Sequence, residues 1–265
     1  MSESSEGIHP LVWSAGFIAV TLLLAQGCRM GASRTQRGMI RSLLLEGIAA
    51  AELCASCFEL IIVADNYGVS MYAIFLFILT IWWSMVWGDA TACPYTLLED
   101  VVEDKATLRE AVLKTWAQLV GGCLIFRYVQ LFWYLELSPT HTGRAFENCT
   151  ADLQVSPMLG TAIEGIATCL CRLTSKIISY HEPRFAAALD SFVGTALVVA
   201  AFNYSGGYFN PVLATSLKFG CMGHSAWEHV FVYWFGACGG ALAATALWRI
   251  PQIRNRLVRS KSKFE

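Results

Sequence analysis

The sequence predicts an all-α, polytopic membrane protein, and its composition, its apolar segments and an internal repeat carry that prediction. Hydrophobic residues make up 55% of the 265 residues and charged residues only 15%, and the mean hydropathy is +0.49. A water-soluble domain carries roughly 25% charged residues, so an ordinary soluble enzyme is excluded. The net charge of −1 provides no basic field that would recruit nucleic acid.

Apolar segments that approach the roughly 20 residues needed to cross a bilayer follow one another along the chain. They are 11–28, 39–64, 71–88, 109–134, 157–180, 186–204 and 227–248. The first is as short as the core of a signal peptide, but Glu3 and Glu6 precede it and its basic residues follow it. A signal peptide has the opposite arrangement, so we expect an extra N-terminal helix that is retained.

Basic residues set the expected orientation, because positively charged loops stay on the cytoplasmic side. The stretch after the first segment and the C-terminal tail are both basic: Arg29, Arg34, Arg37 and Arg41, then Arg249, Arg254, Arg256, Arg259, Lys261 and Lys263. Alternation of the spans then places loop 135–156 on the lumenal side. That loop contains Asn148-Cys149-Thr150, an N-glycosylation acceptor that is used only there.

Three short matches recur in the same order at nearly one offset, which indicates an internal repeat. Glu46-Gly47-Ile48-Ala49 recurs 118 residues later as Glu164-Gly165-Ile166-Ala167, and Gly121-Gly122 recurs as Gly239-Gly240. Cys93-Pro94-Tyr95 corresponds to Asn210-Pro211-Val212, 117 residues later. Each half holds an odd number of full spans, so the second half is expected to enter the membrane the other way up.

The repeat divides the chain into five expected parts. They are 1–38, an N-terminal hydrophobic helix and basic loop; 39–134, the first inverted repeat; 135–156, a lumenal loop; 157–250, the second inverted repeat; and 251–265, a basic cytoplasmic tail.

Two short runs, 94–98 and 211–217, begin with proline and are too short to span a bilayer. Proline suits the first position of a helix, and Asn210 fits the cap position before it. Each run is predicted to be a half-helix that starts at membrane depth, where irregular backbone must be buried in protein or line a water-filled cavity. Half-helices from inverted halves meet N-terminus to N-terminus, and their positive ends repel cations and protons.

Glu46 and Glu164 occupy matching places in the two halves. A carboxylate inside a bilayer is costly and indicates a function by default. We expect each to accept backbone N–H groups of the re-entrant loops; the alternative is a protonated or interface-seeking glutamate. For Glu52, Glu59 and Arg127 we expect pairing inside the bundle or snorkelling.

The tripeptides Cys93-Pro94-Tyr95 and Asn210-Pro211-Val212 are here called the first and the second box. The second box and the spans around it resemble one known family. The residues are Asn210-Pro211-Val212, Glu46, Glu164 and Tyr233-Trp234-Phe235-Gly236, and they resemble the aquaporin family over about residues 39–250. The degenerate box Cys93-Pro94-Tyr95, the extra N-terminal segment and Cys221, eleven residues past Asn210, are similar to the unorthodox, intracellular branch, especially its aquaporin twelve-like members. The resemblance implies a right-handed bundle of six spans with two half-helices, assembled as a homotetramer.

The resemblance also implies a selectivity filter, which falls at Ala73, Val198, Gly207 and Leu213. Leu213 stands where the family carries an arginine. Such an apolar ring without a charge is expected to tolerate a larger or less polar solute than water. At the first box Cys93 is only a weak donor, and Tyr95 adds bulk and a hydroxyl.

Two further clusters leave alternatives open. Negative charges crowd the end of the first half-helix, at Glu99, Asp100, Glu103 and Asp104. Acid is unfavourable there, so we expect a solvated face; the alternative is a vestibule that attracts cations. Cys54 and Cys57 have the spacing of a redox motif but lie in a hydrophobic segment, so we expect them to pack as small apolar residues.

The leading functional expectation is a membrane channel for passive transport of water or small neutral solutes such as glycerol or hydrogen peroxide. Diffusion down a gradient needs no cofactor and no bond chemistry, so no enzyme activity is expected. One alternative is a redox-active membrane protein that uses Cys54, Cys57 or Cys93. The other is a non-conducting scaffold in which Tyr95 plugs the pore.

The C-terminal residues Lys261-Ser262-Lys263-Phe264-Glu265 have the form of a dilysine retrieval signal. We therefore expect residence in the endoplasmic reticulum or another internal membrane. The alternative is that these lysines belong to a positive cluster that attracts anionic lipid.

Overall fold

The computed structural model describes residues 8–258, and every predicted apolar segment lies in a helix or a run of helices, apart from the last two residues of 71–88. The long helices are α1 (Pro10–Thr35), α2 (Gly38–Val86), α4 (Leu108–Leu124) followed by α5 (Phe126–Tyr134), α6 (Pro157–His181) and α7 (Ala186–Ser205). The last crossing joins α9 (Ala226–His229), the π-helix η3 (Val230–Phe235) and α10 (Gly236–Arg249), with α11 (Pro251–Val258) after it. The predicted all-α helical bundle is confirmed.

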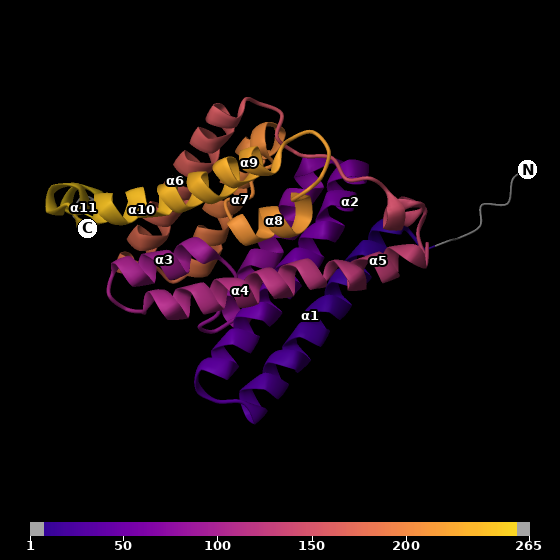
Figure 1. Cartoon of the computed structure of the whole chain (residues 1–265), viewed down its shortest axis with the longest axis horizontal. Coiled ribbons are helices and arrows are strands. Elements are labelled where there is room, and N and C mark those ends of the chain that lie inside the picture. Colours follow the sequence, from indigo (N-terminus) through magenta and orange to yellow (C-terminus); the bar gives the residue numbers. More distant parts are fainter. Residues whose placement is uncertain (1–7, 259–265) are drawn as a thin grey trace, which may run out of the picture.

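Two short helices, α3 (Pro94–Val102) and α8 (Pro211–Lys218), lie between the longer helices α4 and α10 (Figure 1). Loop 135–156 carries two single turns of 3₁₀-helix, η1 (Pro139–His141) and η2 (Arg144–Phe146). In α2 the backbone turns at Gly68, whose φ of 81° lies in the left-handed region that favours glycine. This turn separates the two spans predicted at 39–64 and 71–88.

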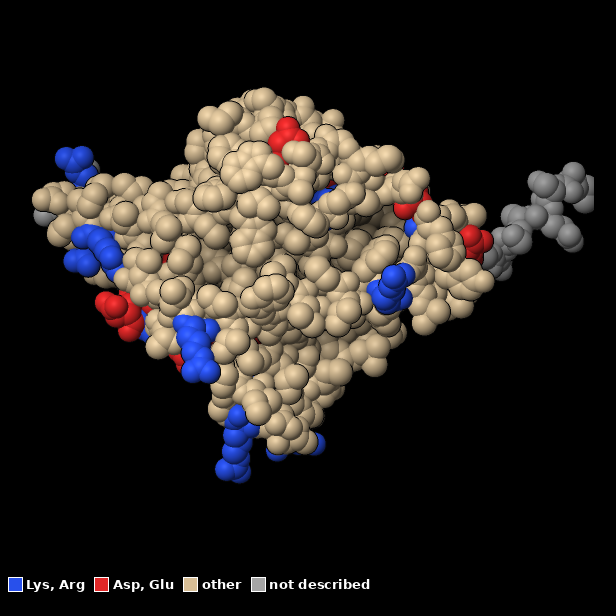
Figure 2. All heavy atoms as spheres, in the orientation of Figure 1, with Lys and Arg blue, Asp and Glu red and all other residues tan. Residues whose placement is uncertain are grey.

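Among the described residues, α1, α2, α7 and the stretch Ala226–Arg249 are long and apolar enough to cross a membrane. The predicted spans at 109–134 and 157–180 do not reach that measure. The first is divided between α4 and α5, and Glu164 and Arg172 lower the hydropathy of the second. Charged side chains gather toward the edges of the face in Figure 2, and its broad middle carries few of them.

The extra N-terminal helix extends further than predicted and carries its own buried charge. α1 continues to Thr35, and Arg29 inside it is only 4% exposed. Its guanidinium donates to the carboxylate of Glu52, which also accepts from the indole N–H groups of Trp82 and Trp87 at 3.3 and 3.0 Å. The expectation that Arg29 belongs to a cytoplasmic loop is therefore wrong, because a buried partner keeps this charge inside the bundle. Glu52 is paired, as expected.

Glu59 anchors loop 135–156 to the bundle. Its carboxylate bonds to Nε2 of His141 at 2.8 Å and accepts from Nε1 of Trp133 at 2.9 Å, and all three side chains are buried. Pairing of Glu59 inside the bundle is therefore confirmed. Arg127 is exposed and bonds to Gln130 of the same helix at 2.8 Å.

Matching glycines bring the helices of each half into backbone contact. A Cβ on Gly121 would lie 2.1 Å from the carbonyl oxygen of Gly47, and one on Gly240 would lie 2.1 Å from that of Gly165. No side chain fits at either place, so α4 meets α2, and α10 meets α6, through small residues. The predicted match of Gly121 with Gly239 is wrong by one residue. The π-helix η3 inserts an extra residue before α10 and shifts the register.

Candidate functional site

Both short helices start at the prolines of the two boxes. In front of α8, Oδ1 of Asn210 accepts from the N–H groups of Val212 at 3.0 Å and Leu213 at 3.3 Å, which caps the helix. Cys93 occupies the same place in front of α3 and makes no side-chain cap bond. Pro94, Pro211 and Val212 are buried. The second box is therefore the more firmly held of the two.

Asn210 also reaches across to the other half. Its Nδ2 donates to the carbonyl oxygen of Ala92 at 2.8 Å. Ala92 and Phe209 take matching positive φ angles of 50° and 47°, a costly conformation for residues other than glycine. A side-chain amide carries two N–H groups. One N–H of Asn210 is thus left without a protein partner among residues 8–258.

The strained loop before α3 is held by Glu46. Its carboxylate is 1% exposed and accepts from the backbone N–H groups of Thr91 at 3.1 Å and Ala92 at 3.0 Å. Gln118 of α4 donates to the same oxygen at 2.8 Å. A buried carboxylate with several backbone donors fixes the direction of the peptide groups it binds.

Glu164 holds the loop before α8 in the same way. Its carboxylate is fully buried and accepts from the N–H groups of Tyr208 at 3.2 Å and Phe209 at 2.7 Å, and from the hydroxyl of Ser205 at 2.6 Å. The repeat therefore places one glutamate under each re-entrant loop.

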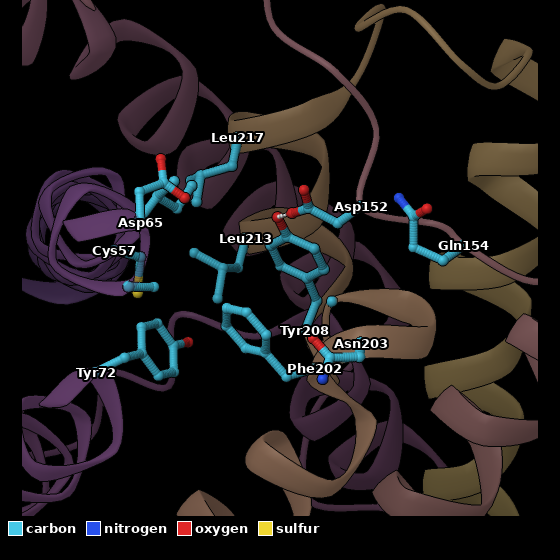
Figure 3. A pocket seen from close by; sticks show the side chains of 14 residues that line it. Cys57, Asp65, Tyr72, Asp152, Gln154, Phe202, Asn203, Tyr208, Leu213 and Leu217 are labelled. Carbon is cyan, nitrogen blue, oxygen red and sulfur yellow. Dashed lines mark hydrogen bonds between the residues drawn. The ribbon is translucent and has the colours of Figure 1, made fainter. Parts of the chain in front are cut away.

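A cavity of about 300 Å³ lies beside α8 on the side of loop 135–156, with walls from α2, α7 and α8 (Figure 3). The side chains that give it its character are aromatic, apolar and acidic. They are Tyr72, Phe202, Tyr208, Leu213, Asp65 and Asp152.

Two of the four predicted filter residues, Gly207 and Leu213, line this cavity. Ala73 and Val198 do not, and Tyr72 and Phe202 contribute rings instead. A Cβ on Gly207 would lie 2.7 Å from the carbonyl oxygen of Val198, so the α7 backbone sits directly behind this glycine.

Beyond the four predicted filter positions, the cavity also carries negative charge. No lysine or arginine is among its lining residues, but the carboxylates of Asp65 and Asp152 stand on either side of Leu213 (Figure 3). Neither aspartate lies in the repeated motifs, and only the folding of loop 135–156 brings Asp152 to this place.

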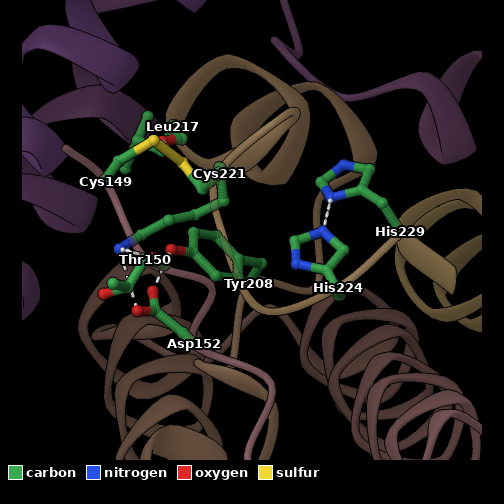
Figure 4. The surroundings of a disulfide bond; sticks show 9 residues. Cys149, Thr150, Asp152, Tyr208, Leu217, Cys221, His224 and His229 are labelled. Atoms are coloured by element: carbon green, nitrogen blue, oxygen red, sulfur yellow. Dashed lines mark hydrogen bonds and ion pairs between the residues drawn. A yellow bond between two sulfur atoms is a disulfide. The ribbon is translucent and has the colours of Figure 1, made fainter. Parts of the chain in front are cut away.

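Residues 149–154, here called the strap, bring Asp152 to the cavity (Figure 4). Cys149 forms a disulfide with Cys221, and Met222 exchanges backbone hydrogen bonds with the strap at 2.8 and 3.0 Å. Asp152 then accepts from the hydroxyl of Tyr208 at 2.5 Å and from Nζ of Lys218 at 2.8 Å. The disulfide was not predicted, since nothing in the spacing of ten cysteines selects this pair. Asn148, the predicted glycosylation acceptor, is exposed directly before the strap.

The acidic residues at the end of α3 are not all exposed to solvent, and cations neutralise some of them. Glu99 is buried, binds the guanidinium of Arg172 at 2.5 Å and accepts from the hydroxyl of Thr245 at 2.9 Å. Lys176 lies 3.0 Å from Glu103. The expectation of a solvated face is therefore wrong for Glu99, because cations on α6 compensate the acids on α3.

Tyr95 lies against this ionic cluster. The guanidinium of Arg172 stands 5.7 Å from the centre of its ring, a cation–π distance. The tyrosine of the first box thus contacts α6, on the side of the bundle away from the strap.

The two cysteines with redox-motif spacing are single thiols in α2, and Cys57 also lines the cavity beside α8. Cys54 and Cys57 are buried free thiols within α2, as the packing interpretation expects. Across residues 8–258, no group of three or more His, Cys, Asp or Glu side chains is placed to hold a metal ion.

Comparisons with known proteins agree on one family. Aquaporin-11 of Milnesium tardigradum is 30% identical over 236 residues, which cover 88% of this chain and 86% of that protein. Aquaporin-12 of Mus musculus is 26% identical over 265 residues, covering 94% and 90%. The aquaglyceroporin from Plasmodium falciparum has a solved structure that matches with a TM-score of 0.61 at 13% identity, covering 82% of this chain and 99% of that one. No model of a protein family matches the chain.

Proposed function

The chain belongs to the aquaporin family, and we propose that it conducts water or small neutral solutes down their gradients. The path would run between α3 and α8 and past the cavity at Leu213. The single observation that carries the proposal is the link between the two boxes, in which Asn210 caps one half-helix, binds the loop of the other and keeps one N–H for a passing solute.

The cavity favours solutes larger or less polar than water, such as glycerol or hydrogen peroxide. Leu213 and the rings of Tyr72 and Phe202 present apolar surface, and no arginine narrows the space. The solved structure that shares the fold is named an aquaglyceroporin, so glycerol is the first solute to test.

The orientation proposed from loop charge gains support from the disulfide. Disulfides form in oxidising compartments such as the lumen of the endoplasmic reticulum. Cys149 and Cys221 lie on the face where loop 135–156 was expected to be lumenal. Asn148 is exposed on that face and is proposed to be glycosylated there.

The proposal is tested with purified protein in vesicles. Light scattering after a rapid change of osmolyte reports water and glycerol flux, and a dye enclosed in the vesicles reports peroxide. We expect at least one flux to exceed that of protein-free vesicles several-fold. Vesicles that contain folded protein and stay at the protein-free rate for all three solutes would favour the alternative, a non-conducting or redox-active scaffold.

We also propose a homotetramer with one path per subunit, and residence in an internal membrane. Native mass measurement that finds only monomers in mild detergent would contradict the tetramer. The retrieval lysines Lys261 and Lys263 lie outside the described residues. Changing both to serine is expected to move tagged protein toward the cell surface, and wild-type protein found at the surface would contradict the proposal.

A further inference from the structure

The cation that binds Asp152 comes from the last residue of α8, not from the position of Leu213 in its first turn. Lys218 is the last residue of α8, and its side chain is only 10% exposed. Its Nζ lies 2.8 Å from Oδ1 of Asp152 and donates to the carbonyl oxygen of Thr150 at 3.0 Å. The C-terminal end of a helix favours a positive charge at this position.

The carboxylate that Lys218 binds faces the cavity. Asp152 lines the space beside Leu213 and keeps 32% of its side chain exposed. The strap, closed by the Cys149–Cys221 disulfide, holds it there. Without Lys218, no other cation among residues 8–258 would pair with the carboxylate of Asp152 where it faces the cavity.

The other charged groups at this mouth do not replace Lys218. Asp65 lines the same cavity, and Arg144 binds it at 2.7 Å. Both of these side chains are substantially exposed, at 44% and 27%, so solvent screens the pair. Glu147 binds Arg144 from the other side at 3.0 Å. Lys218, at 10% exposure, is the better shielded of the two cations, and the carboxylate that it binds stays 32% exposed in contact with the cavity.

We propose that Lys218 and Asp152 together determine the charge specificity of the outer mouth, in place of an arginine at the position of Leu213. This inference rests on the proposed function, because it names the residues that keep a path for neutral solutes closed to ions. Lys218 cancels the charge of Asp152, so cations gain nothing by approaching. The carboxylate retains acceptor positions beyond those used by Lys218 and Tyr208, and these accept from hydroxyl groups of a solute.

The test compares ion and neutral-solute flux in vesicles that contain one variant each. Lys218→Met removes the cation, and Lys218→Gln removes it while keeping an N–H donor for Thr150. Asp152→Asn/Lys218→Met removes both charges. Lys105→Gln is the matched control, because Lys105 is a largely exposed lysine paired with Glu103 at the other end of the bundle.

We expect both Lys218 variants to pass potassium several-fold faster than wild type, and the double variant and Lys105→Gln to stay at the wild-type rate. Asp152→Asn leaves Lys218 unopposed and is expected to admit chloride but not potassium. The inference would be overturned if Lys218→Met or Lys218→Gln inserts in the membrane and its potassium flux equals that of wild type. If neither lysine variant inserts, the test is the chloride flux of Asp152→Asn. A flux above that of wild type supports the role of the Lys218–Asp152 pair, and a flux equal to that of wild type refutes it. Water and glycerol flux of wild type, recorded separately, tests the proposed function without bearing on the ion result.

Discussion

The side-chain amide of Asn210 donates to the carbonyl oxygen of Ala92 at 2.8 Å, across 118 residues of sequence. The same side chain caps α8 through its oxygen. One residue therefore holds the start of the second half-helix and ties it to the loop of the first. Cys93, its counterpart, makes no cap bond, so the link between the two halves depends on the second box.

Glu164→Gln is expected to destabilise the protein. The carboxylate of Glu164 accepts from Ser205, Tyr208 and Phe209, and a glutamine would turn an NH₂ group toward these donors. At least one buried N–H then loses its acceptor, at a cost of about 1–3 kcal/mol. Thermal unfolding in detergent should show a lower Tm than wild type. Glu147→Gln, which changes an exposed carboxylate, is the control; equal Tm values for Glu164→Gln and wild type would contradict the bracing role.

Tyr95→Ala is expected to raise water flux several-fold. The ring of Tyr95 lies against Arg172, and its removal leaves a space beside the first box that water can enter. Stopped-flow light scattering measures the rate. Tyr95→Phe keeps the ring and should stay near wild type. A water flux in Tyr95→Ala no higher than in wild type, with equal insertion, would show that the ring does not limit the path.

Reduction of the Cys149–Cys221 disulfide is expected to lower stability and loosen the strap. The two cysteines are 72 residues apart, and closing a loop of that size in the unfolded chain is worth roughly 4 kcal/mol. The Tm of wild type should fall on adding a dithiol, while that of Cys149→Ser/Cys221→Ser should start lower and not respond. A wild-type Tm insensitive to full reduction would count against the strap as a stabilising element.

The loop that follows α8 is expected to lose stability in acid. Burial lowers the pKa of His224 below its ordinary value of 6.5, an effect that outweighs the opposing charges of Glu228 and Asp152. His224 bonds to His229 at 3.0 Å (Figure 4). The folded state therefore prefers the neutral ring. Stability is full above pH 6.5 and falls as the pH drops through the lower, folded-state pKa.

The measurement is the Tm between about pH 7.5 and about pH 5, the range in which histidines titrate. His224→Gln should flatten the decline relative to wild type. A decline of the same slope in His224→Gln would assign it to other groups.

The parts of the site that the sequence predicted are those that the repeat carries. Glu46, Glu164 and the two box prolines recur at matching places, so one half predicts the other. The register of α10 differs by one residue from the one that the repeat predicts, because the π-helix before it adds a residue that no motif reveals.

The parts that sequence analysis missed are made by contacts between distant segments. Asp152 and Lys218 meet because a disulfide folds the strap onto α8. Arg29 is buried in the bundle because the carboxylate of Glu52, on another helix, pairs with its guanidinium. Tyr72 lines the cavity where Ala73 was expected, since one residue along a helix of 3.6 residues per turn rotates the side chain by about 100°. The hydrophobic periodicity of one segment does not predict contacts between distant segments such as these.

The central claim is that solutes pass the cavity at Leu213 on their way between the half-helices. The most direct test is glycerol and peroxide flux through vesicles that contain Leu213→Arg, with Leu213→Met as a control of similar size. The arginine would place a long charged side chain in the cavity that Tyr72 and Phe202 also line. We predict a several-fold loss of both fluxes in Leu213→Arg and wild-type rates in Leu213→Met. Unchanged flux in Leu213→Arg, with normal insertion, would contradict the account and place the path elsewhere.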